Sequence, residues 1–476
     1  MTTYSMRSLL TLEVDLNRPE HMPSPEGYIS ALAWSQYGSS QPGVDESTWL
    51  AYQSKEQSTL SNRRLEFTAP EATKLQVALK QHGLEVNTQK YSSAASAVLN
   101  SIIGMRITQT KSQPVSPLTP SLALLQNPRG VMAKDNPPNF AAIFEKIFLL
   151  GSAAEAGAAV TVSGLWKRSA ERRMENDPLL RVIDNSIQHG DVTIVGARVD
   201  SPRSAKQQGA ESLMRPPVFI KSPFGWFNLC WTRLNSDDWV DALPSKVWVD
   251  WAMCLLRAGV GFSYLWEASW YNKLAEMIID PDITALSSLV ESPIEIMPWV
   301  SSREDPEVRN VSSRMKWKTI NGQMLRAEIN RFFVEHGLLE MSFQDALEKA
   351  SADRQLVDEL IRIRQIRTGK ALPWEAVTSA LTIRASSPGD NDYYGFWRKN
   401  GPRITYVEPA TEWLAVLASL SSDHPESVIN LGDVMQNLRI LGLRPAVREV
   451  VGLLENAGLA RGSDDADLGL KIETAY

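Results

Sequence analysis

The residue types that could carry catalysis are few and scattered in this chain of 476 residues. Its histidines and cysteines are candidate metal ligands, but they stand far apart in the sequence: His21, His82, His189, His336, His424, Cys230 and Cys254. No glycine-rich phosphate loop, Gly-x-Ser-x-Gly elbow or His-Glu-x-x-His pair occurs. We therefore expect no catalytic residues, no metal site, no cofactor and no small-molecule substrate, and a protein that is not an enzyme.

One spacing does match a catalytic pattern. Arg331 and His336 are separated by four residues, and this Arg-x4-His arrangement resembles the ribonuclease motif of helical HEPN-type domains. The resemblance implies that these two side chains would act on RNA. Arginine is common enough in this chain for such a match to arise by chance. A divergent nuclease, using this pair or a metal site hidden from sequence analysis, is the alternative to a protein without catalysis.

Basic residues, several with aromatic neighbours, gather in four groups. Such groups attract nucleic acid because Lys and Arg neutralise phosphates while aromatic rings stack on bases. The groups are Lys167, Arg168, Arg172 and Arg173 beside Trp166; Arg314, Lys316 and Lys318 around Trp317; Arg362, Arg364, Arg367 and Lys370; and Trp397, Arg398 and Lys399 with Tyr393, Tyr394, Phe396 and Arg403. Each group alone is typical of a solvated face or a helix C-terminus. Together they indicate contact with nucleic acid.

The elements that must position these groups are mostly helices. Helical spacing of apolar residues predicts helices over 71–81, 94–103, 139–150, 178–188, 245–256, 264–279, 322–336, 342–366 and 373–383. Alternation predicts strands over 8–16 and 191–199, and a hairpin formed by 218–221 and 225–232. Six prolines make 111–138 an extended connector.

The C-terminal residues predict a small domain of known type. A strand over 403–407 precedes helices over 411–420, 431–441 and 445–456, then a turn over 462–467 and a terminal strand over 468–472. Three helices, a tight turn between the second and third, and a terminal hairpin resemble the winged-helix fold. The resemblance implies that the third helix could enter a DNA major groove, with Arg439, Arg444 and Arg448 as its contacts.

The charge of this domain argues for a different partner. Residues 411–476 carry ten acidic and five basic side chains, and the would-be wing contains Asp464, Asp465 and Asp467. Phosphate neutralisation dominates the affinity of proteins for nucleic acid. We therefore expect this domain to dock on protein rather than to read DNA.

A chain of this length exceeds one compact core. We expect an α+β, mostly helical, multidomain protein ending in a winged helix. Its regions would be 1–138, an N-terminal α/β region with the proline-rich connector; 139–300, a Trp-rich mixed region; 301–402, a helical region; and 403–476, the winged helix. No signal peptide and no apolar run of about 18 residues is present, so we expect a cytoplasmic location without membrane contact.

These features predict a non-catalytic subunit of a bacterial multi-protein assembly that handles DNA, of the kind that defends against phage or other foreign DNA. Other protein subunits are its expected partners, and DNA is a candidate partner bound by the basic groups. A protein scaffold without any nucleic-acid role is the third hypothesis.

Overall fold

The computed structural model describes residues 4–12, 24–37, 50–54, 63–67, 77, 79–81, 83, 102, 115–125, 140–152, 160–185, 187–188, 216–281, 292–368, 372–383, 392–401, 403–461 and 470–476. This part of the chain is mostly helical, with three small sheets. Of the segments predicted from sequence, the strand over 191–199, the turn over 462–467 and almost all of the helices over 71–81 and 94–103 lie outside it.

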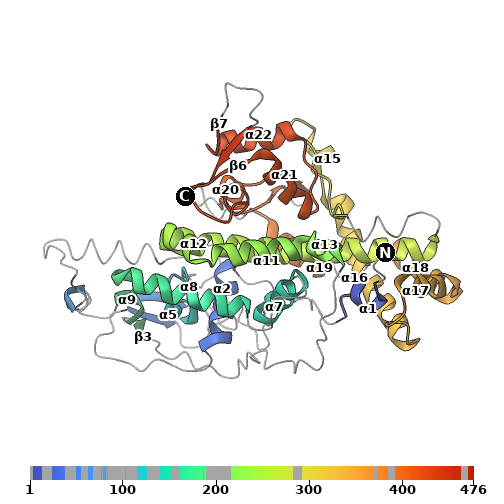
Figure 1. Cartoon of the computed structure of the whole chain (residues 1–476), viewed down its shortest axis with the longest axis horizontal. Coiled ribbons are helices and arrows are strands. Elements are labelled where there is room, and N and C mark those ends of the chain that lie inside the picture. Colours follow the sequence, from blue (N-terminus) through green and yellow to red (C-terminus); the bar gives the residue numbers. More distant parts are fainter. Residues whose placement is uncertain are drawn as a thin grey trace.

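One long helix, α13 (Ser245–Ile279), runs through the centre of the molecule (Figure 1). Its buried side chains point in all directions around the helix axis, so it has to be covered on nearly every face. The helices packed against it are α2 (Pro25–Tyr37), α7 (Phe140–Leu150), α11 (Pro223–Leu234), α16 (Ser312–Glu335), α17 (Phe343–Ala352), α18 (Arg354–Gln365), α19 (Leu372–Leu381) and α20 (Thr411–Ser419). The buried apolar side chains form one connected cluster from Met6 to Ile472.

The prediction of two helices over 245–256 and 264–279 was wrong because α13 is continuous. Two glycines lie between those segments and allow close packing: a Cβ atom on Gly259 would lie 2.6 Å from the Phe227 ring, and one on Gly261 would lie 2.5 Å from the Leu381 side chain. Glycine at these positions removes a side chain where another element has to approach the helix.

In Figure 1 the N-terminal elements lie on one side of α13. The predicted strand over 8–16 was wrong at its start, because Met6–Leu9 forms the short helix α1, whose Met6 and Arg7 amides donate to the Met341 and Leu339 carbonyls. Within the predicted connector 111–138, residues Pro120–Leu125 form helix α5. The remaining elements are α8 (Val162–Asn176), α9 (Pro178–Asn185), and strand β1 (Leu50–Ser54), which pairs antiparallel with β2 (Arg63–Phe67) and parallel with β3 (Ile187–Gln188).

The predicted hairpin over 218–232 was also wrong. Residues Pro217–Ile220 form helix α10, and α11 begins at Pro223. Ser222 is the N-cap of α11, since its hydroxyl accepts a hydrogen bond from the Phe224 amide at 3.2 Å. A Ser-Pro pair begins a helix as readily as it forms a turn, because Ser caps the first free amide and Pro needs none.

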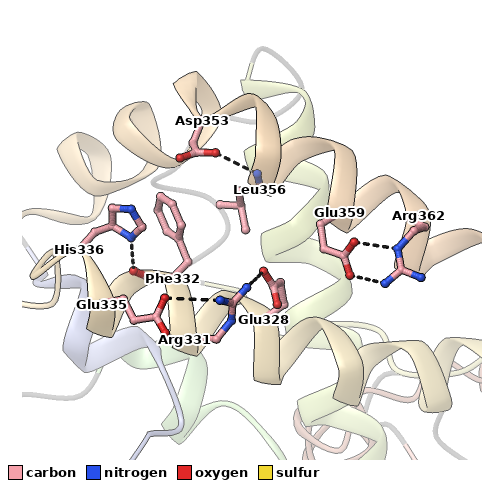
Figure 2. Close-up of polar contacts among 9 residues, drawn as sticks. All are labelled: Glu328, Arg331, Phe332, Glu335, His336, Asp353, Leu356, Glu359 and Arg362. Atoms are coloured by element: carbon pink, nitrogen blue, oxygen red, sulfur yellow. Dashed lines mark hydrogen bonds and ion pairs between the residues drawn. The ribbon is translucent and has the colours of Figure 1, made fainter.

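The region after α13 is helical, as predicted, but the segment 342–366 is two helices and not one. Ser342 caps α17, and α17 ends at Ala352. Asp353 then caps α18, its carboxylate accepting from the Leu356 amide at 2.9 Å (Figure 2). The short helix α15 (Pro306–Arg309) completes this region, and another short helix, α12 (Asp237–Ala242), directly precedes α13.

A hairpin follows α19, formed by β4 (Trp397–Asn400) and β5 (Ile404–Val407), which pair antiparallel. Only the second of these strands was predicted. Residues 411–476, the C-terminal unit, contain α20, α21 (Leu431–Ile440) and α22 (Val447–Asn456), and their bounds are close to those predicted. Strands β6 (Val428–Asn430), β8 (Lys471–Glu473) and β7 (Ala460–Arg461) form an antiparallel sheet in that order.

A buried ion pair joins α13 to the segment that follows α19. Both terminal nitrogens of Arg257 donate to the Asp392 carboxylate, at 2.9 and 2.8 Å, and the same guanidinium donates to the carbonyls of Ala380 and Thr382. The two charged side chains are 5% and 2% exposed. Because each charge is desolvated, each depends on the other.

Removing one partner of this pair should therefore lower the stability of the folded protein. We expect Asp392→Ala to lower the free energy of unfolding by about 3 to 5 kcal/mol, since it leaves a buried cation unpaired. The matched control is Glu340→Ala, which removes the carboxylate of the exposed pair with Arg7 and should cost at most about 1 kcal/mol. Urea unfolding followed by circular dichroism measures both, and equal losses would contradict this account of the pair.

Close packing between α13 and α16 gives a second prediction. A Cβ atom on Gly322 would lie 2.6 Å from the Cα of Ala268, so the two helices would have to separate. We expect Gly322→Ala to destabilise the protein by about 1 to 3 kcal/mol. Gly452 in α22 has no atom within 4 Å of such a Cβ. Gly452→Ala should therefore raise the stability by up to about 1 kcal/mol, and the same sign for both variants would refute the prediction.

Candidate nucleic-acid interface

A pocket of about 450 Å³ lies between α16, α19 and the β4–β5 hairpin. We call it the basic-aromatic pocket. It is lined by Asn310, Ser312, Lys316, Trp317, Trp374, Glu375, Thr378, Lys399, Arg403 and Thr405. Two of the groups predicted from sequence, around Trp317 and around Lys399, thus meet at one place although they are far apart in the chain.

Asn310 holds two walls of the pocket together. Its side-chain oxygen accepts from the amide of Ser312 at 3.0 Å and from the amide of Thr405 at 3.1 Å, and its side-chain nitrogen donates to the Arg403 carbonyl at 3.3 Å. The Val311 amide also donates to the Thr405 carbonyl at 2.7 Å. The start of α16 is therefore fixed to strand β5.

The third wall, α19, is fixed to strand β4. The Trp374 ring lies against the Trp397 ring, with 5.3 Å between their centroids. The backbone adds two hydrogen bonds, from the Ile383 amide to the Trp397 carbonyl and from the Phe396 amide to the Leu381 carbonyl. Trp397 itself is fully buried, so it supports the pocket from behind and Trp374 lines the pocket in front of it.

Positive charge dominates the pocket. Lys399 and Arg403 are exposed, and within the described part of the chain neither side chain forms an ion pair. The Lys316 ammonium lies 5.2 Å from the centroid of the Trp317 ring. Glu375 is the one acidic residue among the described residues that line the pocket. Cations beside a half-buried indole are a combination that can bind phosphate and stack on a base.

The other members of these two groups lie outside the pocket. Arg314 is exposed one turn before Trp317 on α16. Lys318 points toward α13: burial lowers its pKa below the usual range, although Glu276 and Glu295 oppose the shift. Arg398 forms an ion pair with Glu408 at 2.6 Å.

The basic residues on α8 form ion pairs and hydrogen bonds with other groups of the protein. Arg172 bridges to Asp237 at 3.2 Å and to Asp241 at 2.5 Å. Arg173 is buried over the Trp248 ring, 4.2 Å from its centroid, and burial lowers its pKa to about 9. The remaining contacts run from Arg173 to the Ser245 and Leu118 carbonyls, from Arg168 to the Asn235 carbonyl and from Lys167 to Glu171. Arg168, Arg172 and Arg173 thus hold α8 against its neighbours, whereas the Lys167 pair lies within α8.

The basic residues at the end of α18 also form ion pairs and hydrogen bonds with other groups of the protein. Arg362 forms a bidentate pair with Glu359, and Arg364 pairs with Glu276 of α13 at 3.0 Å. Arg367 donates to the Arg364 and Ile366 carbonyls, both at 2.8 Å. Lys370 lies outside the described residues.

The Arg-x4-His pair is at the exposed end of α16, where Figure 2 shows the two side chains turned to different partners. Arg331 lies between Glu328 at 2.5 Å and Glu335 at 3.4 Å. The His336 ring stacks on Phe332, with centroids 4.2 Å apart, and its Nδ1 is 2.9 Å from the Phe332 carbonyl. In this arrangement both side chains interact with their own helix and form no shared site.

The described residues give little support for metal binding or for cysteine chemistry. They contain no group of three or more His, Cys, Asp or Glu side chains placed to hold a metal ion. Both cysteines are buried and unpaired, and burial raises the pKa of the Cys230 thiol to about 12. None of the helices described is long and apolar enough to cross a membrane.

Comparison with known proteins adds no family. No protein-family model, no curated protein and no solved structure matches this chain. The functional interpretation therefore depends on the pocket and its surroundings. Trp374 and Glu375 were not predicted as site residues, because helical spacing indicated α19 but nothing local indicated that α19 lies beside β4.

The geometry at Arg331 yields a third prediction. Because both side chains contact their own helix, we expect Arg331→Ala and His336→Ala to change the stability by no more than about 1 kcal/mol, as is usual for exposed contacts. We also expect the unaltered protein to leave labelled RNA intact with and without Mg²⁺, as judged on denaturing gels. RNA cleavage that both substitutions abolish, with circular dichroism unchanged, would establish the nuclease alternative.

Proposed function

We propose that this protein is a non-catalytic subunit of a bacterial multi-protein assembly that handles DNA, binding nucleic acid through the basic-aromatic pocket and other subunits through its C-terminal unit. The observation that carries the proposal is the meeting of Lys316 and Trp317 with Lys399 and Arg403 around one pocket. Defence against phage or other foreign DNA is a role that such an assembly would serve.

The contrast between the basic groups supports this choice of site. Arg172 and Arg362 are already paired with carboxylates, and Arg173 is buried. A cation that is paired inside the protein has to break that pair before it can neutralise a phosphate. Among the described residues Lys399 and Arg403 have no ion pair to break, so phosphate affinity is expected to concentrate at the pocket.

The C-terminal unit is, in our proposal, a winged-helix domain. Three helices, α20, α21 and α22, and an antiparallel pair of strands after the third helix, β7 and β8, support this interpretation. The turn between α21 and α22 contains Gly442 with a φ of 76°, a conformation that glycine adopts without strain.

The surroundings of α22 support a role for this helix other than reading DNA. In a helix-turn-helix protein the start of this helix contacts DNA bases. In this chain the turn and the first turn of α22 contact the segment 294–302. The Ile296 amide donates to the Gly442 carbonyl at 3.0 Å, and Glu449 accepts from the Ser302 amide at 3.0 Å. The acidic surplus of the unit favours the same conclusion.

Two lysines of α16 give a matched test, because Lys316 lines the pocket and Lys318 is directed toward α13. We expect the pure protein to bind labelled DNA with an affinity that falls as salt rises. Lys316→Gln should weaken binding about five- to ten-fold at 0.1 M salt and reduce the slope of log K against log salt by about 0.7 to 0.9, which corresponds to one phosphate contact. Lys318→Gln should leave both unchanged.

Fluorescence anisotropy with duplex and single-stranded DNA measures this effect. If the pure protein bound neither form at any salt concentration, the nucleic-acid role would be refuted and the scaffold hypothesis would remain. If Lys316→Gln and Lys318→Gln weakened binding equally, the pocket would not be the site.

A further inference from the structure

We infer that the basic-aromatic pocket takes one unstacked base of a single-stranded nucleic acid, with the phosphates on either side bound by cations of its rim. The inference rests on the proposed function and narrows it, because it names the form of nucleic acid that the site selects. It follows from the shape of the pocket, its aromatic walls and the positions of its charges.

The shape of the site favours an unstacked base. The pocket is a half-open hollow of about 450 Å³, a volume in the range of sites that take small organic groups. A duplex keeps both faces of each base covered by its neighbours, so a base can enter a cavity only after it leaves the stack. A single strand offers unstacked bases at much smaller cost. Concavity therefore selects single strands over duplex.

The aromatic walls supply the surface on which such a base can stack. Trp317 is half-buried on α16, and its indole lines the pocket. Trp374 is 8% exposed and lies against the buried Trp397. A ring that is packed from behind loses little freedom when a ligand covers its front. Stacking on indole does not depend on base identity, because every base has a π face.

Cations occur on two walls of the pocket, which Asn310 joins. Lys316 comes from α16, where the exposed Arg314 precedes it, and Lys399 and Arg403 flank the tight turn of the β4–β5 hairpin. A base within a strand has a phosphate on each side, which these two walls can bind. A free mononucleotide has phosphate on one side only and leaves one wall unused.

The acidic residue of the lining strengthens this arrangement. Glu375 is exposed on α19, whereas the cations are on α16 and the hairpin. Its negative charge repels phosphate from the α19 wall. The backbone of a bound strand is thereby directed to the rim, and the base to the interior.

The test uses the full-length protein and a fluorescent oligo-deoxythymidine of about twelve nucleotides. A duplex of the same length and thymidine monophosphate are the comparison ligands. We expect the single strand to bind at least ten-fold more tightly than the duplex, and the monophosphate to compete only at far higher concentration. Trp317→Ala should weaken single-strand binding by about five- to a hundred-fold, the range for losing one stacked base, while Trp317→Phe should retain most of the affinity.

A charge variant keeps the test valid if Trp317→Ala does not fold. Lys399→Glu with Arg403→Glu changes only exposed side chains and should abolish single-strand binding. The matched control is Lys349→Glu with Arg354→Glu, two exposed cations on α17 and α18, which should bind as the unaltered protein does.

The outcomes separate this inference from the proposed function. Salt-dependent binding that favours duplex, or that Trp317→Ala leaves unchanged in a folded protein, would overturn the unstacked-base site while the proposed nucleic-acid role stands. Equal affinity for the monophosphate and the oligonucleotide would show a nucleotide site instead of a strand site. Binding to none of the three ligands would refute both proposals.

Discussion

The burial of α13 is the constraint on which the rest of the structure depends. A helix of 35 residues with apolar side chains on nearly every face is stable in water only if other elements cover it all round. Segments from both ends of the chain do so, and the two charges that α13 buries each recruit a partner from far away in the sequence. Arg257 binds Asp392, and Glu267 binds Thr11 and Arg326. Covering one helix therefore organises the whole described chain.

The need to cover α13 also explains why most of the basic groups form ion pairs or hydrogen bonds within the protein. Elements that pack around an apolar helix still have polar edges, and these have to be joined to one another. Arg172 joins α8 to α12, Arg364 joins α18 to α13, and Arg233 joins α11 to Asp423 in the C-terminal unit. Arginine suits such links because its planar fork makes several hydrogen bonds at once. Lys316, Lys399 and Arg403 form no such link among the described residues, and all three line the pocket.

The sequence predicts the helical character, most helices after residue 300 and the three helices of the C-terminal unit, because amphipathic spacing and capping residues are local signals. The prediction was wrong at Ser222-Pro223, because such a pair can form a turn or begin a helix and here it begins α11. It was also wrong at α13, which is continuous where two helices were predicted. Lys316 and Lys399 were both predicted as contacts, but their meeting was not. That requires the long-range link through Asn310, which no spacing reveals.

The hydrogen bonds of Arg257 couple the stability of the pocket to that of the core. Arg257 holds the carbonyls of Ala380 and Thr382 at the end of α19, and the same helix contributes Trp374 and Thr378 to the pocket. The α19 wall of the pocket is therefore hydrogen-bonded directly to the central helix α13. Because a ligand that binds only the folded state stabilises everything that unfolds with its site, occupancy of this pocket and integrity of α13 are linked equilibria. Proteolytic resistance of the distant N-terminal helices should then report on whether the pocket is filled.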